Sequence, residues 1–135
     1  MREILFRGKI KDTGEWGEGI PIKNQIGTFI CFDENPHYCY QYGYMEIDEI
    51  IQVDPETVCQ FTGLIDKNGE KIFEKDIVYY PFENEHFTVC WDEEESRFII
   101  DRIDAYHSFG CVYGNELEVV GNVFDNPELV EVQHE

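Results

Sequence analysis

Short runs in which apolar and polar residues alternate recur along most of the chain and predict β-strands. In the first run, Ile4 and Phe6 are expected to face inward. A turn signal at 12–16 predicts another short strand after it, and residues 45–53 fit either a strand or one or two helical turns. Alanine occurs only at Ala105 and aromatic residues make up 15% of the chain, so we expect little helix. The other predicted strands are residues 2–10, 25–32, 76–80, 87–91, 97–103 and 117–124.

The strongest turn signal is the stretch Asp66-Lys67-Asn68-Gly69, which lies between two apolar pairs and predicts a β-hairpin. Asn68 and Gly69 adopt positive φ at low cost, so the chain is expected to reverse there. Asp76 stands just before a predicted strand, where its carboxylate can accept hydrogen bonds from backbone amides and fix the entry of the chain.

The order of these elements predicts a mainly β protein with little helix. Residues 1–60 are expected to form an N-terminal antiparallel β-region. Residues 61–135 contain four or five short strands in quick succession, which favour a small SH3-like β-barrel over a sandwich. Gly121 within the last strand predicts a bulge or a close backbone approach, and Pro127 follows a turn that leads into one helical turn. We expect the two regions to form one cooperative unit.

Charge narrows the class of partner. The chain has 29 acidic and 10 basic residues, a net charge of −19. Residues 1–23 carry five basic and four acidic side chains, which leaves −20 for residues 24–135. A nucleic-acid groove needs clustered Lys and Arg, and the sequence after Lys23 has no such cluster. Direct binding of nucleic acid is therefore not expected.

Cysteine usage and hydropathy predict the compartment. The chain has five cysteines, an odd number, with no Cys-x-x-Cys pair, and its N-terminus lacks the apolar run of a signal peptide. No apolar run approaches the length that spans a membrane. These features predict reduced thiols in a cytoplasm and no association with a membrane.

Candidate reactive groups each have a simpler structural interpretation. Glu74 and Asp76 form a carboxylate pair suited to acid–base chemistry, but a role for Asp76 in ordering the turn is favoured. The acidic run at 92–95 lacks the ligand spacing of a calcium loop and is expected to be a solvated hairpin loop. A serine catalytic triad is not expected, because the chain offers only Ser96 and Ser108 as nucleophiles. Ser96 adjoins the acidic run, and Ser108 directly follows His107, so in a strand the side chains of these two neighbours point in opposite directions.

Metal binding is likewise not expected. Cys31, His37 and Cys39, with His86 or Cys90, offer soft ligands for zinc, but their spacing matches no standard module. The sequence therefore predicts no catalytic residue, no cofactor and no metal site, and we expect the protein not to be an enzyme.

The most unusual local pattern is a ladder of alternating tyrosines. In a single strand these four phenols would line one face. Base stacking is a poor use for such a face without nearby cations, whereas tyrosine is enriched at the centres of protein interfaces. Packing against the barrel is an equally good interpretation. The candidate interaction residues are Tyr38, Tyr40, Tyr42 and Tyr44.

Long motifs give the chain a family resemblance. The central stretches 54–58, 60–69 and 72–78, the closing stretch 118–129, and the opening stretches 2–4, 6–8 and 14–16 resemble the YopX family of phage and prophage proteins. The resemblance implies no specific activity, because members look like accessory proteins of mobile elements. The motif positions expected to have structural roles are Gly63, Asp66, Asn68, Gly69, Asp76, Gly121, Asn122, Asn126 and Pro127.

Two positions depart from the family pattern. Cys59 and Lys75 stand where the family usually has glycine. If the second glycine has a positive φ, Lys75 adopts a left-handed conformation at a modest steric cost.

Two functions from different classes follow. The leading hypothesis is a phage or prophage accessory protein that acts as a non-enzymatic interaction module and binds another protein, or a second copy of itself, through its aromatic face. The alternative is an acidic decoy that imitates DNA and occupies a host nuclease or another DNA-binding protein, because the net charge of −20 over residues 24–135 would attract a basic site.

Overall fold

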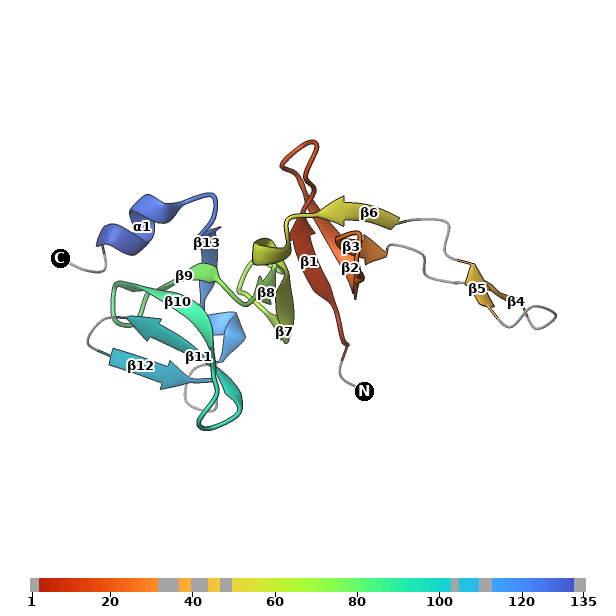
Figure 1. Ribbon diagram of the computed structural model, residues 1–135. Coiled ribbons are helices and arrows are strands. Elements are labelled where there is room, and N and C mark those ends of the chain that lie inside the picture. Colours follow the sequence, from red (N-terminus) through yellow and green to blue (C-terminus); the bar gives the residue numbers. More distant parts are fainter. Residues whose placement is uncertain are drawn as a thin grey trace. The chain divides into compact units, whose positions relative to one another are not determined.

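The computed structural model describes residues 3–31, 37–39, 44–46, 50–102, 105–109 and 113–132 (Figure 1). The chain divides into two compact units, one formed by Ile4–Gln60 and the other mainly by Phe61–Glu135. The described elements are almost all antiparallel strands, with one six-residue α-helix and two 3-10 turns. The predicted mainly β class with little helix is therefore confirmed.

Four strands of the N-terminal unit lie side by side in the order β6-β3-β2-β1, and β1 also pairs with the first residues of β7. The turn between β1 and β2 contains Gly14 at φ 74°, a value that favours glycine. The sequence of residues 45–53 fitted either a strand or one or two helical turns. The described part of this segment contains strand β6 and no helix. These strands are β1 (Phe6–Lys9), β2 (Trp16–Lys23), β3 (Thr28–Cys31) and β6 (Ile50–Val53).

The edge strand β6 turns back onto β1 at one end. Ile10 forms a β-bridge with Val53, and the Asp54 amide donates to the Lys9 carbonyl oxygen at 2.8 Å. Gly8 permits this approach, because a Cβ there would lie 3.0 Å from a methyl carbon of Val53. Ile4 is 64% exposed, so the prediction that it faces inward was wrong; it precedes β1 and does not share the alternation of that strand.

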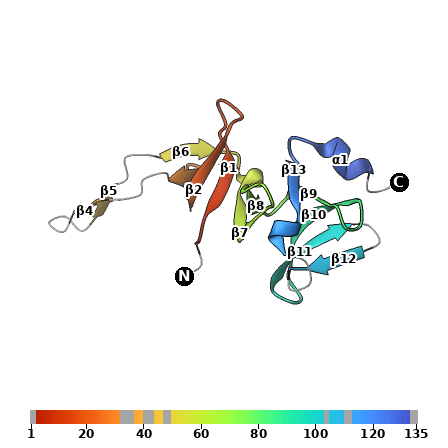
Figure 2. The same cartoon turned by 180° about the vertical axis from the view of Figure 1, so that it is seen from behind.

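The C-terminal unit combines the β7–β8 hairpin with a five-stranded antiparallel sheet in the order β12-β11-β10-β9-β13 (Figures 1 and 2). After β13 the chain turns into helix α1 (Figure 2). The elements are β7 (Cys59–Ile65), β8 (Lys71–Phe73), β9 (Asp76–Tyr80), β10 (Glu85–Asp92), β11 (Arg97–Arg102), β12 (Ala105–Ser108), η2 (Gly114–Glu116), β13 (Glu118–Asn122) and α1 (Pro127–Val132).

The hydrophobic core of this unit follows the predicted alternation. Phe87 and Val89 of β10 face Val78 of β9 and Ile100 of β11, and all four side chains are fully buried. Ile72 and Leu117 complete the core. Among the described strands the sheet ends at β12 and β13, so its closure into an SH3-like barrel stays a prediction.

Backbone geometry at two motif positions agrees with the sequence. Lys75 has φ 72°. This is the left-handed conformation that we predicted for the case in which the glycine usual at this position in the family has a positive φ. The register of β13 against β9 shifts between Val119 and Gly121, which is the predicted bulge, and a Cβ at Gly121 would overlap the Asn126 side chain. At the β7–β8 turn only Gly69, at φ 84°, and not Asn68 takes a positive φ.

Residues 105–108 lie between the predicted strands 97–103 and 117–124, so no strand was expected there. They form β12, whose register with β11 pairs Ile99 with Ser108 and Arg102 with Ala105. The local sequence Ala-Tyr-His-Ser carries no alternation of apolar residues, so its extended form depends on pairing with β11.

Candidate functional site

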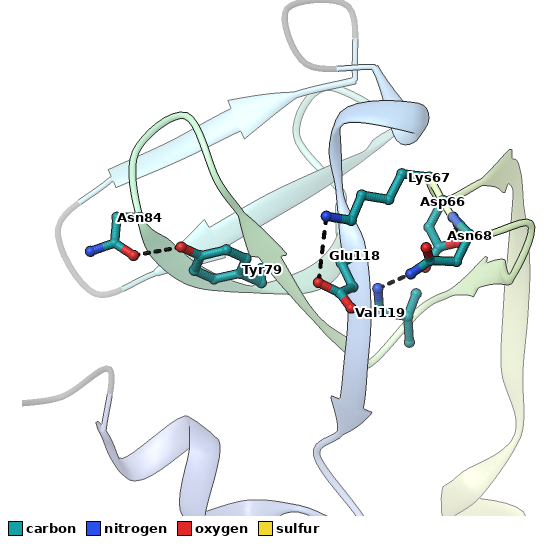
Figure 3. A network of polar contacts seen from close by, with 7 residues as sticks. All are labelled: Asp66, Lys67, Asn68, Tyr79, Asn84, Glu118 and Val119. Atoms are coloured by element: carbon teal, nitrogen blue, oxygen red, sulfur yellow. Dashed lines mark hydrogen bonds and ion pairs between the residues drawn. The ribbon is translucent and has the colours of Figure 1, made fainter.

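The Asp66 carboxylate joins the β7–β8 turn to β13. Its Oδ1 accepts hydrogen bonds from the amides of Asn68 and Glu70, both at 2.8 Å, and its Oδ2 accepts one from the Val119 amide at 2.9 Å. Lys67 of the same turn approaches Glu118 at 3.7 Å (Figure 3). The carboxylate thus fixes the hairpin against a strand that is more than 50 residues away along the chain.

Asp76 acts in the same way at the start of β9. Its side chain is 1% exposed, and its Oδ2 accepts a hydrogen bond from the Phe73 amide at 2.7 Å. A buried carboxylate bound to the backbone holds the β8–β9 turn, which supports the structural interpretation over an acid–base pair with Glu74.

The closing motif contains a similar amide cap. Asn122 Oδ1 accepts hydrogen bonds from the Phe124 amide at 3.0 Å and the Asp125 amide at 2.9 Å, while Asn126 Oδ1 accepts one from the Asn122 amide at 3.2 Å. Pro127 then occupies the first position of α1. The Asn122 and Asn126 side chains therefore bind backbone amides and stabilise the turn between β13 and α1.

A surface cleft of about 580 Å³ opens on the C-terminal unit, and we call it the Trp91 cleft. The indole of Trp91 meets the ring of Phe98 edge-on, with centroids 4.9 Å apart. Apolar side chains dominate the cleft, and its polar groups are hydroxyls and one guanidinium. Its lining residues are Thr62, Gly63, Leu64, Trp91, Ser96, Arg97, Phe98, Ser108 and Phe109.

The position of Trp91 follows from strand geometry. Phe87, Val89 and Trp91 occupy alternate positions of β10 and so share one face, but only the first two are in the core. Trp91 lies near the end of the strand and is 43% exposed. An aromatic side chain on a rigid strand is therefore presented to solvent.

An acidic loop, residues 92–95, borders this cleft between Trp91 and Ser96. The Asp92 side chain accepts a hydrogen bond from the Glu94 amide at 3.2 Å, which orders the loop, and Glu93, Glu94 and Glu95 are exposed. Ser96 ends the loop with φ 54°. The loop that joins two lining residues of the cleft, Trp91 and Ser96, thus carries four carboxylates, and Arg97, which also lines the cleft, follows it in the sequence.

A second group of aromatic side chains surrounds Tyr80. The His107 ring lies 5.9 Å from the Tyr80 ring and 5.4 Å from that of Phe87, and its Nε2 is 3.0 Å from Glu83 Oε1. Burial raises the pKa of the Tyr80 phenol, and the carboxylates of Glu116 and Glu83 raise it further.

Two more surface hollows adjoin this group, and both include Glu116. One of about 640 Å³ is lined by Tyr80, Pro81, Phe82 and Glu116, and the Phe82 ring is 87% exposed. The other, of about 670 Å³, includes the exposed side chains of Ile65 and Tyr113. Exposed aromatic or apolar side chains therefore line several hollows on this unit.

The tyrosine ladder lies largely outside the described residues. Tyr38 is on β4 (His37–Cys39) and Tyr44 is on β5 (Tyr44–Glu46), which pair antiparallel with Cys39 opposite Tyr44. Tyr40 and Tyr42, and the side chains of all four residues, lie outside the part of the chain that the structure describes. Tyr38 and Tyr44 therefore lie on two different strands, β4 and β5.

The other candidate groups belong to different units of the chain. Cys31 is buried in the N-terminal unit, whereas His86 and Cys90 are on β10, where the His86 ring packs 5.3 Å from that of Tyr79. Burial raises the pKa of the Cys90 thiol, against the opposing effect of Lys75. Within the described residues, no three His, Cys, Asp or Glu side chains gather in a way that would hold a metal ion.

The two serines come together in an unforeseen way. Sequence reasoning considered Ser96 and Ser108 only for a catalytic triad, yet both line the Trp91 cleft. Sequence reasoning did not single out Trp91, and the signal that could have located this site is this large aromatic residue at the end of an alternating run, next to four acidic residues. In the described part of the chain, no helix is long and apolar enough to cross a membrane.

Comparisons with known proteins agree on the family and the fold. The family model described as YopX protein matches residues 5–131. The crystal structure of protein EF1440 from Enterococcus faecalis is similar to this chain with a TM-score of 0.65 and 23% sequence identity, over 96% of this chain and 99% of that one. The search of curated proteins gave no match. At this identity, the likeness to EF1440 shows a shared fold.

Proposed function

This chain belongs to the YopX family, and from that premise we propose that it is a non-enzymatic interaction module that binds another protein through exposed aromatic side chains on its β-sheet. We further propose that it is a phage or prophage accessory protein of the bacterial cytoplasm, and that its C-terminal unit has an SH3-like arrangement. The observation that carries the binding role is the Trp91 cleft.

The chemistry of the cleft supports binding. Trp91 is presented by a strand and braced edge-on by Phe98, so it loses little conformational freedom when a partner covers it. Tryptophan is the residue type most enriched among side chains that dominate binding energy. The described residues that line the cleft include no carboxylate, imidazole or thiol, which supports recognition over acid–base or nucleophilic catalysis.

The charge of the unit supports a protein as the partner. Residues 61–135 contain five basic and 18 acidic side chains, a net charge of −13. Among these cations, Lys67 is paired with Glu118 and Arg102 with Glu85. Such a surface repels the phosphates of DNA and RNA, whereas a protein with a neutral or basic surface approaches it freely.

The proposal is tested by comparing partner capture by two variants. Tagged Trp91→Ala and Tyr106→Ala proteins are incubated with host lysate, and the captured protein is purified and its affinity measured by calorimetry. Tyr106 is a matched control because it is an exposed aromatic residue of β12 that does not line the cleft. We expect Trp91→Ala to weaken binding by about tenfold or more and Tyr106→Ala to leave it unchanged.

Two results would overturn this proposal. In the first, the partner binds Trp91→Ala as tightly as the wild type while both variants retain the wild-type urea midpoint. In the second, duplex DNA displaces the captured protein, a result that would support the acidic decoy instead. A Tyr40→Ala/Tyr42→Ala variant examines separately whether the tyrosine segment contributes to the same complex.

A further inference from the structure

We propose that the Trp91 cleft binds an extended peptide segment of its partner, in which a large apolar side chain fills the cleft and neighbouring Lys or Arg residues contact the acidic loop at 92–95. This inference rests on the proposed interaction function and names the chemistry of the partner. It is carried by the combination of a largely apolar cleft and an acidic loop that joins two of its lining residues, Trp91 and Ser96.

The size and lining of the cleft fit side chains of a peptide. Pockets that bind small ligands are about 300–1,000 Å³ and largely apolar with a few polar groups. The Trp91 cleft, at about 580 Å³, lies within that range and is open to the surface. The T-shaped pair of Trp91 and Phe98, with Phe109, presents ring edges and faces to an entering Leu, Phe or Trp side chain.

The hydroxyls in the cleft suit an extended backbone. Ser96 and Ser108 reach the cleft from the end of the β10–β11 loop and from β12, and each hydroxyl can both donate and accept a hydrogen bond. Thr62 lines the cleft from β7, and its hydroxyl donates to the Ile72 carbonyl oxygen at 2.7 Å. A peptide backbone crossing the cleft has amide and carbonyl groups with which the exposed Ser96 hydroxyl can pair.

The charge at the edge selects a cationic segment. Among the described residues, Glu93, Glu94 and Glu95 are exposed and form no ion pair, and Arg97 is the one cation beside them. Four carboxylates against one guanidinium give the sequence 92–97 a net charge of −3. Lys or Arg next to the apolar anchor relieves this repulsion, whereas an acidic segment or a phosphate adds to it.

Intrinsic fluorescence provides a direct test. The chain has two tryptophans, so a Trp16→Phe protein leaves Trp91 as the only indole reporter. The probes are short synthetic peptides with a central Leu flanked by Lys, a matched set flanked by Glu, and a set with Lys around a central Gly. We expect only the Lys-Leu peptides to shift the Trp91 emission to shorter wavelength, with affinity at least about tenfold above both other sets at low salt.

Charge variants of the loop separate its role from a general effect of charge. The triple variant Glu93→Gln/Glu94→Gln/Glu95→Gln is expected to lower the affinity for the Lys-Leu peptide by about fivefold or more. It should also make that affinity less dependent on salt. The control is Glu70→Gln/Glu74→Gln/Glu128→Gln, which removes the same charge from residues that belong neither to the cleft lining nor to the acidic loop, and it is expected to change affinity by less than about twofold. Urea midpoints establish that both variants are folded.

The outcomes distinguish this inference from the proposed function. If no peptide set binds while partner capture still depends on Trp91, the peptide inference is wrong and the interaction function stands. Tighter binding of the Glu-flanked peptides would make Arg97 the recognition group and would overturn the charge argument. If neither peptide binding nor partner capture depends on Trp91, both proposals fail.

Discussion

Among the described residues, three that are not glycine have a positive φ, and each stands directly before a strand. Lys75 at 72° precedes β9, Asn84 at 52° precedes β10, and Ser96 at 54° precedes β11. Asparagine tolerates this conformation, but for lysine it costs about 1–2 kcal/mol. Lys75 is held there because its amide donates to the Val89 carbonyl oxygen at 2.8 Å and its carbonyl oxygen accepts from the Val123 amide at 3.0 Å.

Replacement of this lysine by glycine is therefore expected to stabilise the protein. Lys75→Gly relieves the left-handed strain, and the gain is partly offset by the larger entropy of glycine in the unfolded chain, which leaves about 0.5–1 kcal/mol. The free energy of unfolding is measured with urea. Lys23→Gly, on the extended backbone of β2, is the control and should lower stability by a similar amount. A less stable Lys75→Gly protein would contradict this account.

Tyr80 is expected to make the free energy of unfolding depend on pH. Because burial and the carboxylates of Glu116 and Glu83 raise its pKa above the ordinary value of 10.0, the folded state keeps a proton that the unfolded state releases first. Stability is thus expected to fall as the pH rises above about 10. Tyr80→Phe should make this fall shallower in urea titrations between about pH 8 and 11. An unchanged slope would show that other groups cause it.

At the scale of elements, short polar bridges between turns and strands position the sheet. The β7–β8 turn meets β13 through Asp66, and the β8–β9 turn is closed by Asp76. Each carboxylate satisfies amides that the strands themselves leave unpaired. Such bridges hold the hairpin beside the strands whose ends form the Trp91 cleft.

Loss of the first bridge is expected to be costly. Asp66→Ala leaves three amides without their acceptor, and we expect a loss of about 2–4 kcal/mol in the free energy of unfolding, because hydrogen bonds to charged groups contribute about 1.5–3 kcal/mol each and water replaces part of them. Hydrogen exchange at the Val119 amide should become faster. Glu118→Gln, which weakens only the exposed pair with Lys67, should cost less than about 1 kcal/mol. Equal effects of both changes would refute a special role for Asp66.

At the scale of the whole molecule, charge opposes compactness. The net charge is −19, and residues 24–135 alone carry −20. Folding therefore brings together many carboxylates that the unfolded chain keeps farther apart. Fully buried side chains such as Phe87 and Ile100 offset this repulsion in the C-terminal unit.

Salt is therefore expected to stabilise the protein. Between about 0.01 M and 0.5 M NaCl the screening length falls from about 30 Å to a few ångströms, which weakens the repulsion. A gain of about 1 kcal/mol corresponds to a rise of about 4 °C in the midpoint of thermal unfolding. Sucrose at matched osmolality is the non-ionic control. A midpoint that falls with NaCl would show that attractive ion pairs outweigh the repulsion.

The sequence by itself determined the β class, most strands and the turns at Asp66–Gly69 and Gly121, because alternation and turn residues act through the local backbone. It also placed Lys75 in the left-handed region through the family pattern. The tertiary structure decided what depends on segments distant in sequence: the extension of Ala105–Ser108 into β12, the reach of Asp66 to Val119, and the assembly of the Trp91 cleft from β7, β10, β11 and β12. These arise from strand pairing and packing, which no local pattern of residues encodes.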